Sequence, residues 1–125
     1  GVKLIAISAG LDIVIKEIEK RSGIKFDSSY ANKLIFENGV VSGDVEVLVE
    51  YYNKGEVLVK ACKELGIKPC DVISIGDSEV DIPMMKESGF SIAFNPKSKD
   101  VLVSADIAIF SEKILPLIKL LRFLC

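Results

Sequence analysis

The sequence lacks an excess of basic residues and any long apolar run. It has 16 Lys and Arg against 18 Asp and Glu, for a net charge of -2, so it carries no electrostatic footprint for nucleic acid or for an anionic membrane. The longest apolar stretch near an end, ILPLIKLLRFLC, is interrupted by Pro116, Lys119 and Arg122 and is too short to cross a bilayer. We therefore expect no nucleic acid and no membrane among the partners.

Cysteine is also scarce. The chain has three cysteines, Cys62, Cys70 and Cys125, and no C-x-x-C spacing. An odd number without that spacing argues against a disulfide framework or a zinc site and fits reduced thiols in a cytosol. No signal peptide is visible. We therefore expect a cytoplasmic protein.

Short apolar runs alternate with amphipathic segments along a chain of the length of one domain. An Asn38-Gly39 dipeptide in the first half favours a tight β-hairpin, because both residues tolerate a positive φ. Strands that alternate with helices predict an α/β fold with a doubly wound, mostly parallel sheet, here with a β-hairpin insertion. The predicted strands are 2–8, 32–37, 40–47, 71–75, 90–94 and 105–110; the predicted helices are 11–21, 54–65, 80–87 and 111–121, with a helical turn near 97–102.

Polar residues follow two predicted strands at their carboxyl ends, where ligands of doubly wound sheets gather. Ser8 ends the first strand, and Gly10 lets the backbone turn with free N–H groups that suit an anion. Asp77 follows Gly76 at the end of another strand, and Asp81 lies one helical turn later. Such a carboxylate pair suits Mg²⁺, which takes one or two protein carboxylates plus water and phosphate oxygens. Alternatively, Ser8 is a plain turn residue, Asp77 caps the following helix, and Asp81 favours its dipole.

Lys54 is the third candidate. It lies at the start of a predicted helix, where the helix dipole disfavours a cation. A nearby phosphate or cluster of carboxylates would compensate, with the ammonium acting on developing negative charge. The alternative is a solvated surface lysine.

The segments ISAG, KGE and GDSEVD, in that order on an α/β pattern, resemble the second, third and fourth motifs of the haloacid-dehalogenase-like hydrolases. The segment YANKLIFENGVVSGDVE is similar to the strand-turn-strand that the phosphoserine phosphatase branch carries between its serine and lysine motifs. The resemblance implies a Rossmann-like core and Mg²⁺-dependent hydrolysis of a small phosphorylated metabolite through an aspartyl-phosphate.

The same resemblance implies a role for each motif residue. Ser8, with the backbone of Ala9 and Gly10, would bind the phosphoryl group. Lys54 would steady the nucleophile and the phosphate. Asp77 would ligate Mg²⁺, and Asp81 would support the metal site from close by.

Two features depart from the family pattern. Val80 stands where the branch has an asparagine that contacts phosphate, and valine cannot donate that hydrogen bond. The first motif, D-x-D-x-[TV], is absent, and its first aspartate is the nucleophile in the family. We expect residues 1–125 to be the C-terminal part of a phosphatase core domain whose central first strand and helical cap lie on a segment before Gly1.

The missing strand has a structural consequence. It would normally lie between the strand ending at Ser8 and the one ending at Ile75, leaving two apolar strand edges bare. We expect the missing N-terminal segment or a second chain to cover these edges, and the 125 residues alone to be inactive. The alternative is a catalytically inactive phosphate-binding or interaction module that has lost the nucleophilic aspartate. A nucleotide-binding domain is a third option, weakened by the absence of G-x-G-x-x-G and of a P-loop.

Overall fold

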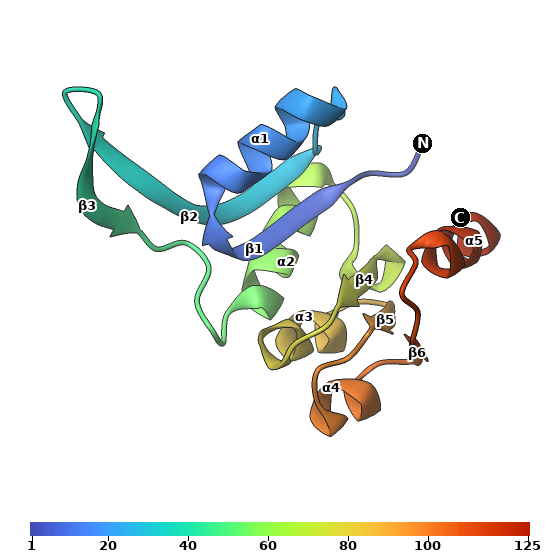
Figure 1. The fold of residues 1–125 in the computed structure, drawn as a ribbon. Coiled ribbons are helices and arrows are strands. Elements are labelled where there is room, and N and C mark those ends of the chain that lie inside the picture. The colour runs from blue at the N-terminus through green and yellow to red at the C-terminus, as the bar shows by residue number, and fades with distance from the viewer.

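The computed structural model describes all 125 residues as an α/β fold (Figure 1). Strands and helices alternate along most of the chain, with a hairpin in the first half and short 3₁₀ turns around the fourth strand. The strands are β1 (Ile5–Leu11), β2 (Ser28–Glu37), β3 (Val40–Glu46), β4 (Ile73–Gly76), β5 (Phe90–Phe94) and β6 (Ile107–Ile109). The helices are α1 (Asp12–Ser22), α2 (Lys54–Leu65), α3 (Ile82–Glu87), α4 (Lys99–Ser104) and α5 (Leu115–Leu124), with 3₁₀ turns η1 (Pro69–Asp71) and η2 (Glu79–Asp81).

The six strands form two separate three-stranded sheets. In one, β1 pairs in parallel with β2, and β2 pairs antiparallel with β3. In the other, β4, β5 and β6 are all parallel. The predicted doubly wound sheet is therefore present as two halves, and neither β1 nor β4 has a hydrogen-bonded partner on its second edge.

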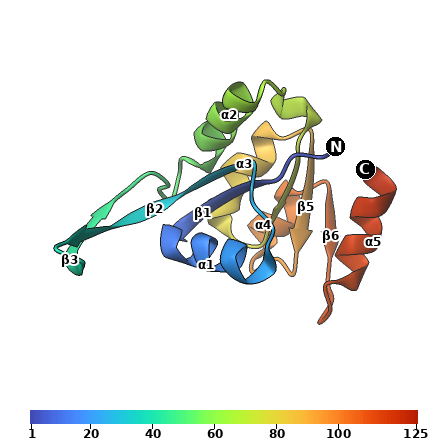
Figure 2. The ribbon, with the colours of Figure 1, turned by 90° about the horizontal axis from the view of Figure 1, so that it is seen from above.

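Helices cover both faces of the two half-sheets. Figure 2 shows α1 on one side of β1 and β2 and α2 on the other, and it shows β5 and β6 between α5 on one side and α3 and α4 on the other. The strands between these helices are shielded on both sides, and the three middle residues of β5 are accordingly buried. The strand β3 extends beyond the helices and is almost wholly exposed (Figure 1).

The hairpin forms at the predicted dipeptide. Asn38 and Gly39 both have positive φ, 52° and 77°, as the tight turn between two antiparallel strands requires. Glu37 pairs with Val40 across that turn. The hairpin prediction is confirmed.

Several predicted boundaries differ from the observed ones. The first strand begins at Ile5 rather than residue 2 and continues to Leu11 rather than ending at Ser8. The segment predicted as one helix over 80–87 is a 3₁₀ turn followed by the short α3, because Pro83 can occupy only the first turn of a helix. The last helix begins at Leu115, ahead of Pro116, rather than at residue 111.

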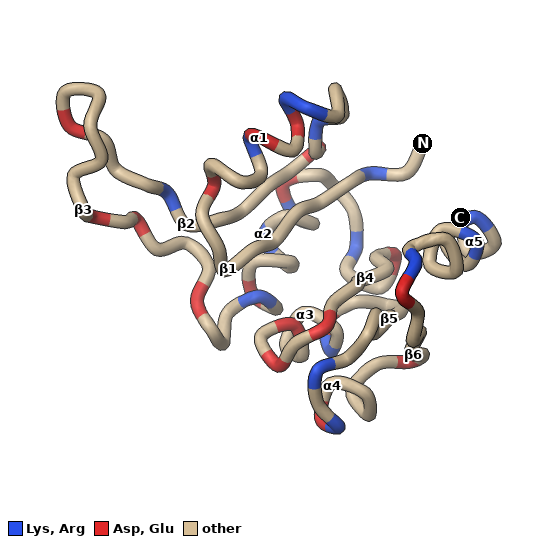
Figure 3. Tube along the Cα trace, in the orientation of Figure 1, with Lys and Arg blue, Asp and Glu red and all other residues tan.

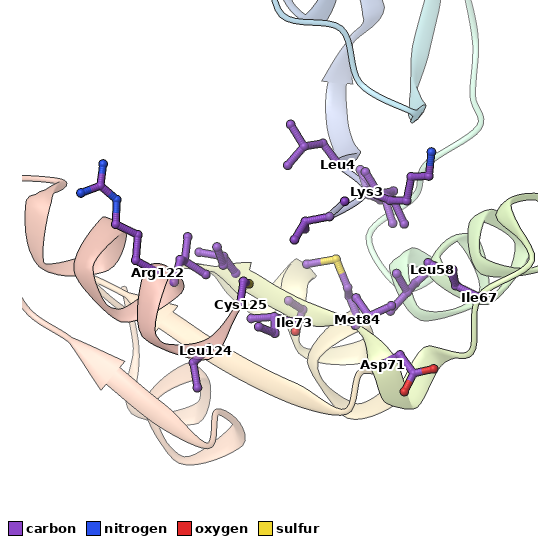
Figure 4. Close-up of a pocket in the computed structure, with 18 of the residues that line it drawn as sticks. Lys3, Leu4, Leu58, Ile67, Asp71, Ile73, Met84, Arg122, Leu124 and Cys125 are labelled. Atoms are coloured by element: carbon purple, nitrogen blue, oxygen red, sulfur yellow. The ribbon is translucent and has the colours of Figure 1, made fainter.

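An apolar cleft of about 790 Å³ separates the two half-sheets (Figure 4). Its walls carry Ile5 and Ile7 from β1 and Ile73 and Ile75 from β4. Side chains from α2, α3 and α5 complete it, and they include Leu58, Met84, Ile118, Leu121 and Leu124. The unpaired edges of β1 and β4 therefore both border the same apolar cleft.

The molecule also exposes more surface than its mass predicts. A folded monomer of this mass should expose about 6,600 Å², whereas this chain exposes 8312 Å² and buries 18 of its 125 residues. The open cleft between the half-sheets and the exposed strand β3 contribute to this excess. No helix is both long and apolar enough to span a membrane.

We predict that the isolated chain self-associates through the cleft, because two unpaired strand edges on an apolar groove are a template for pairing with another chain. Sedimentation velocity should give a mass that rises above 13.6 kDa as the concentration is raised. Ile73→Lys, which places a charge on the β4 edge, should reduce this association. Ile18→Lys, at an exposed position on α1, should not. A monomer at every concentration would contradict the prediction.

Candidate functional site

The site is organised around a buried ion pair between two helical elements. Lys54 is the first residue of α2, and its Nζ lies 2.6 Å from Oδ1 of Asp81 in η2. Both residues are buried, with 7% and 5% of their surface exposed. The interpretation of Lys54 as a solvated surface lysine is therefore wrong. Its position against the helix dipole is compensated by a carboxylate.

Glycine after the lysine lets α2 approach the partner helix closely enough for this pair to form. A Cβ on Gly55 would lie 2.8 Å from the carbonyl oxygen of Pro83 in α3. Any side chain at that position would push α2 away from α3. The KGE motif thus combines a charged residue with the small residue that its placement requires.

The second oxygen of Asp81 binds the backbone that follows β4. Oδ2 accepts hydrogen bonds from the N–H groups of Asp77 at 2.9 Å and Ser78 at 3.1 Å. Ser78 is the N-cap of η2 in a capping box with Asp81, so Asp77 does not cap the following turn as the alternative interpretation had it. A Cβ on Gly76 would lie 2.5 Å from the Cβ of Asp81, which explains the glycine before Asp77.

Burial of Asp81 would by itself raise the pKa of its carboxyl. The hydrogen bond from Lys54 and those from the N–H groups of Asp77 and Ser78 outweigh that effect, so its pKa lies below the ordinary value. Asp81 is therefore ionised at neutral pH. Both of its oxygens already accept hydrogen bonds within the protein, so Asp81 holds Lys54 and the backbone that follows β4.

Asp77 presents its carboxylate outward at the end of β4. Its side chain is 49% exposed, and its Oδ2 lies 3.4 Å from Nζ of Lys97. Lys97 N also donates a hydrogen bond to the carbonyl oxygen of Asp77 at 2.8 Å. In Figure 3 the acidic segment between β4 and α3 lies between the basic residues at the start of α2 and before α4.

The residues present fit Mg²⁺ in part. No group of three or more acidic, histidine or cysteine side chains is clustered for a metal. A half-exposed carboxylate such as that of Asp77 is nevertheless the kind of single ligand that Mg²⁺ uses beside water and phosphate oxygens. The candidate donor in this chain is thus one carboxylate, with the remaining ligands to come from elsewhere.

Ser8, Ala9 and Gly10 lie in an irregular part of β1 rather than in a turn after it. Gly10 N donates to Oγ of Ser8 at 3.0 Å, so its N–H group is engaged and not free as expected. Ala9 and Gly10 are exposed at the surface. No side-chain hydrogen bond joins Ser8 to Lys54 or to Asp77. The predicted residues therefore form two separately linked groups, Lys54 with Asp77 and Asp81, and Ser8 with Gly10.

The sequence-based prediction missed three residues of the site. Ser78 caps η2, Lys97 faces Asp77, and Asn32 binds the backbone beside Ser8 through a hydrogen bond to the carbonyl oxygen of Ala9. Ser78 sits at the start of a capping box, S-x-x-D, which resembles the S/T-x-x-E/Q signature and could have indicated it. Neither Lys97 nor Asn32 has a comparable local signal.

The sequence of this chain matches a known protein family. A family model described as haloacid dehalogenase-like hydrolase matches residues 16–113. The chain belongs to the haloacid dehalogenase-like hydrolase family. This confirms the resemblance of its motifs and the fold class expected from it.

This haloacid dehalogenase-like chain is similar to phosphoserine phosphatases. It is 36% identical over 124 residues to that of Methanocaldococcus jannaschii, covering 98% of this chain and 57% of the relative. It is 35% identical to that of Albidiferax ferrireducens, covering 78% of this chain and 43% of the relative. A solved structure of a phospho-aspartyl intermediate analogue of phosphoserine phosphatase superimposes with a TM-score of 0.78 at 36% identity, covering 93% of this chain and 55% of that one. The chain thus spans about half the length of these relatives.

Acid unfolding tests the electrostatics of Asp81. Its folded pKa lies below the value of about 3.9 for an unfolded aspartate. Its stabilising contribution is therefore fully present above that value and is lost as the pH falls through the folded pKa. We expect Asp81→Asn to show a shallower loss of unfolding free energy than the wild type between about pH 5 and pH 2, measured by urea denaturation. Identical slopes would contradict the assignment.

Proposed function

We propose that this chain supplies the phosphate- and metal-binding half of a Mg²⁺-dependent phosphomonoesterase. The observation that carries the proposal is the buried pair of Lys54 and Asp81 at the base of the exposed Asp77 carboxylate. A lysine held rigidly beside an outward carboxylate suits an anionic ligand and a hard cation together. The similarity to phosphoserine phosphatases over the same residues supports this interpretation.

Each side chain has a distinct role in the proposed reaction. Asp77 would hold Mg²⁺, which would withdraw charge from the phosphoryl oxygens as a Lewis acid. Lys54 contributes a fixed positive charge that needs no reorganisation during the reaction, because Asp81 already orients it. The hydroxyl of Ser8 and the backbone of Ala9 and Gly10 would hold the phosphoryl group from the other half-sheet, with the N–H group of Gly10 exchanging Oγ of Ser8 for a phosphate oxygen.

The nucleophile is expected to come from a strand that fills the cleft between β1 and β4. The first aspartate of the motif on that strand would attack phosphorus and form an aspartyl-phosphate as the bond to the leaving oxygen breaks, and the second aspartate would protonate that oxygen to release the alcohol. Water would then hydrolyse the acyl phosphate to inorganic phosphate. The cleft is apolar, lies between two unpaired strand edges, and separates the two sets of site residues. A segment preceding Gly1 is the proposed source, and residues 1–125 are the proposed C-terminal part of the core domain.

The proposed substrate is a small phosphorylated metabolite, and phosphoserine is the leading candidate because the relatives are phosphoserine phosphatases. Val80 lies inside the GDSEVD segment, where it offers no hydrogen bond to phosphate. We expect weaker phosphate binding than an asparagine there would give. The proposed location is the cytoplasm, in keeping with three free cysteines.

The gene upstream of Gly1 distinguishes the enzyme from an inactive module. The proposal predicts a strand there with the pattern D-x-D-x-[TV]. A start codon directly before Gly1 would instead favour a phosphate-binding or interaction module. Phosphatase activity from residues 1–125 alone would refute the assignment of the nucleophile to another segment.

A substitution at Asp77 tests the metal role in the extended protein that carries the upstream segment. We predict that Asp77→Asn lowers Mg²⁺-dependent phosphatase turnover by about a hundredfold or more. Its melting temperature should change little, because the side chain is half exposed. Asp44→Asn, at an exposed position on β3, is the matched control and should retain turnover. Unchanged turnover in Asp77→Asn would remove this residue from the metal role.

A further inference from the structure

The strand β1 is irregular at the residues proposed to bind phosphate. Ile7 pairs with Tyr30 and Leu11 pairs with Asn32, so a step of four residues on β1 faces a step of two on β2. The extra residues of Ser8, Ala9 and Gly10 leave the regular ladder as a bulge. Bulges redirect side chains and backbone next to functional sites, but a bulge needs contacts that select one conformation.

Asn32 on β2 supplies such a contact. Its Nδ2 donates to the carbonyl oxygen of Ala9 at 2.9 Å, within the bulge. The same Nδ2 donates to the carbonyl oxygen of Val49 at 3.0 Å. Its Oδ1 accepts from the N–H groups of Leu48 at 2.8 Å and Val49 at 2.9 Å. All four hydrogen-bonding positions of the amide are used.

These bonds join the bulge to the segment that leads into α2. Val49 is 1% exposed, so the anchor point is held in the core. A second amide then closes the turn, because Asn53 accepts from Glu50 N at 2.7 Å and donates to the carbonyl oxygen of Leu48 at 3.3 Å. Lys54 follows directly. The two amides thus form a continuous path of hydrogen bonds from Ala9 to the residue before Lys54.

We propose that Asn32 is a positioning residue that sets the bulge of Ser8, Ala9 and Gly10 against the N-terminus of α2. The proposal rests on the proposed function, in which the bulge and Lys54 hold one phosphoryl group. Ser8 and Lys54 have no direct side-chain contact, so their relative placement depends on an intermediary. Asn32 is the side chain that binds both segments.

Binding of inorganic phosphate tests this role. The probe is radiolabelled phosphate in equilibrium dialysis against the extended protein that carries the upstream segment, in which the proposed strand fills the cleft between the two half-sites. We expect Asn32→Ala to weaken phosphate binding by about tenfold, because small displacements of positioned groups have large effects on bound anions. Ser91→Ala is the matched control. Ser91 is 2% exposed and exchanges hydrogen bonds with Asp106 between β5 and β6, so its loss should lower stability while leaving phosphate affinity within about twofold of the wild type.

Comparing the loss of stability with the loss of phosphate affinity in Asn32→Ala and Ser91→Ala separates a positioning role of Asn32 from a purely structural one. Equal losses of phosphate affinity in the two variants, or none in Asn32→Ala, would overturn the proposal while the proposed function stands. Absence of phosphate binding by the wild type would overturn both. If Asn32→Ala loses its far-UV circular dichroism, Asn32→Asp replaces it. That variant keeps an acceptor for Leu48 and Val49 but loses both donated hydrogen bonds, to Ala9 and to Val49. It should bind phosphate about tenfold more weakly than the wild type when both are measured at about 1 M salt, where its added charge is screened.

Discussion

The structure depends on one buried ion pair, between Lys54 and Asp81. Moving either charge out of water is costly, and breaking such a pair by removing one partner typically costs about 3–5 kcal/mol. Here the cost of burial is offset because the carboxylate also accepts hydrogen bonds from two backbone N–H groups. Since the partners lie on α2 and η2, the pair fixes the start of a helix against the loop that carries Asp77. The glycines at 55 and 76 leave the space this arrangement needs.

A second constraint is the division of the sheet. The β1 and β4 edges are unpaired, and apolar side chains from three helices face the space between them. Ser8 lies on one side of this cleft and Asp77 at the end of the strand on the other. The chemistry proposed for the molecule therefore requires an element between two half-sites, and the same element would complete the core. In the proposed enzyme, one strand would therefore serve both catalysis and stability.

The sequence predicted the elements that are specified by residues close together in the chain. The bounds of α2 and β5 follow from helical periodicity and from a short apolar run, and Asn38-Gly39 placed the hairpin. Lys54, Asp77 and Asp81 were recognisable from their motifs. The ion pair between Lys54 and Asp81 was not, because the two residues are 27 positions apart. The bulge in β1 depends on its register with β2. Asn32 has no local signature either, since its four hydrogen bonds go to three residues, Ala9, Leu48 and Val49, that are distant in sequence.

A double-mutant cycle on the ion pair tests the account most directly. Lys54→Met, Asp81→Asn and the double variant are compared with the wild type by urea unfolding at pH 7. The asparagine retains an acceptor for the two backbone N–H groups, so the cycle isolates the contact with Lys54. We predict a coupling free energy of about 2 kcal/mol or more, with the double variant more stable than the sum of the single effects implies. Additive effects within about 0.5 kcal/mol would contradict it.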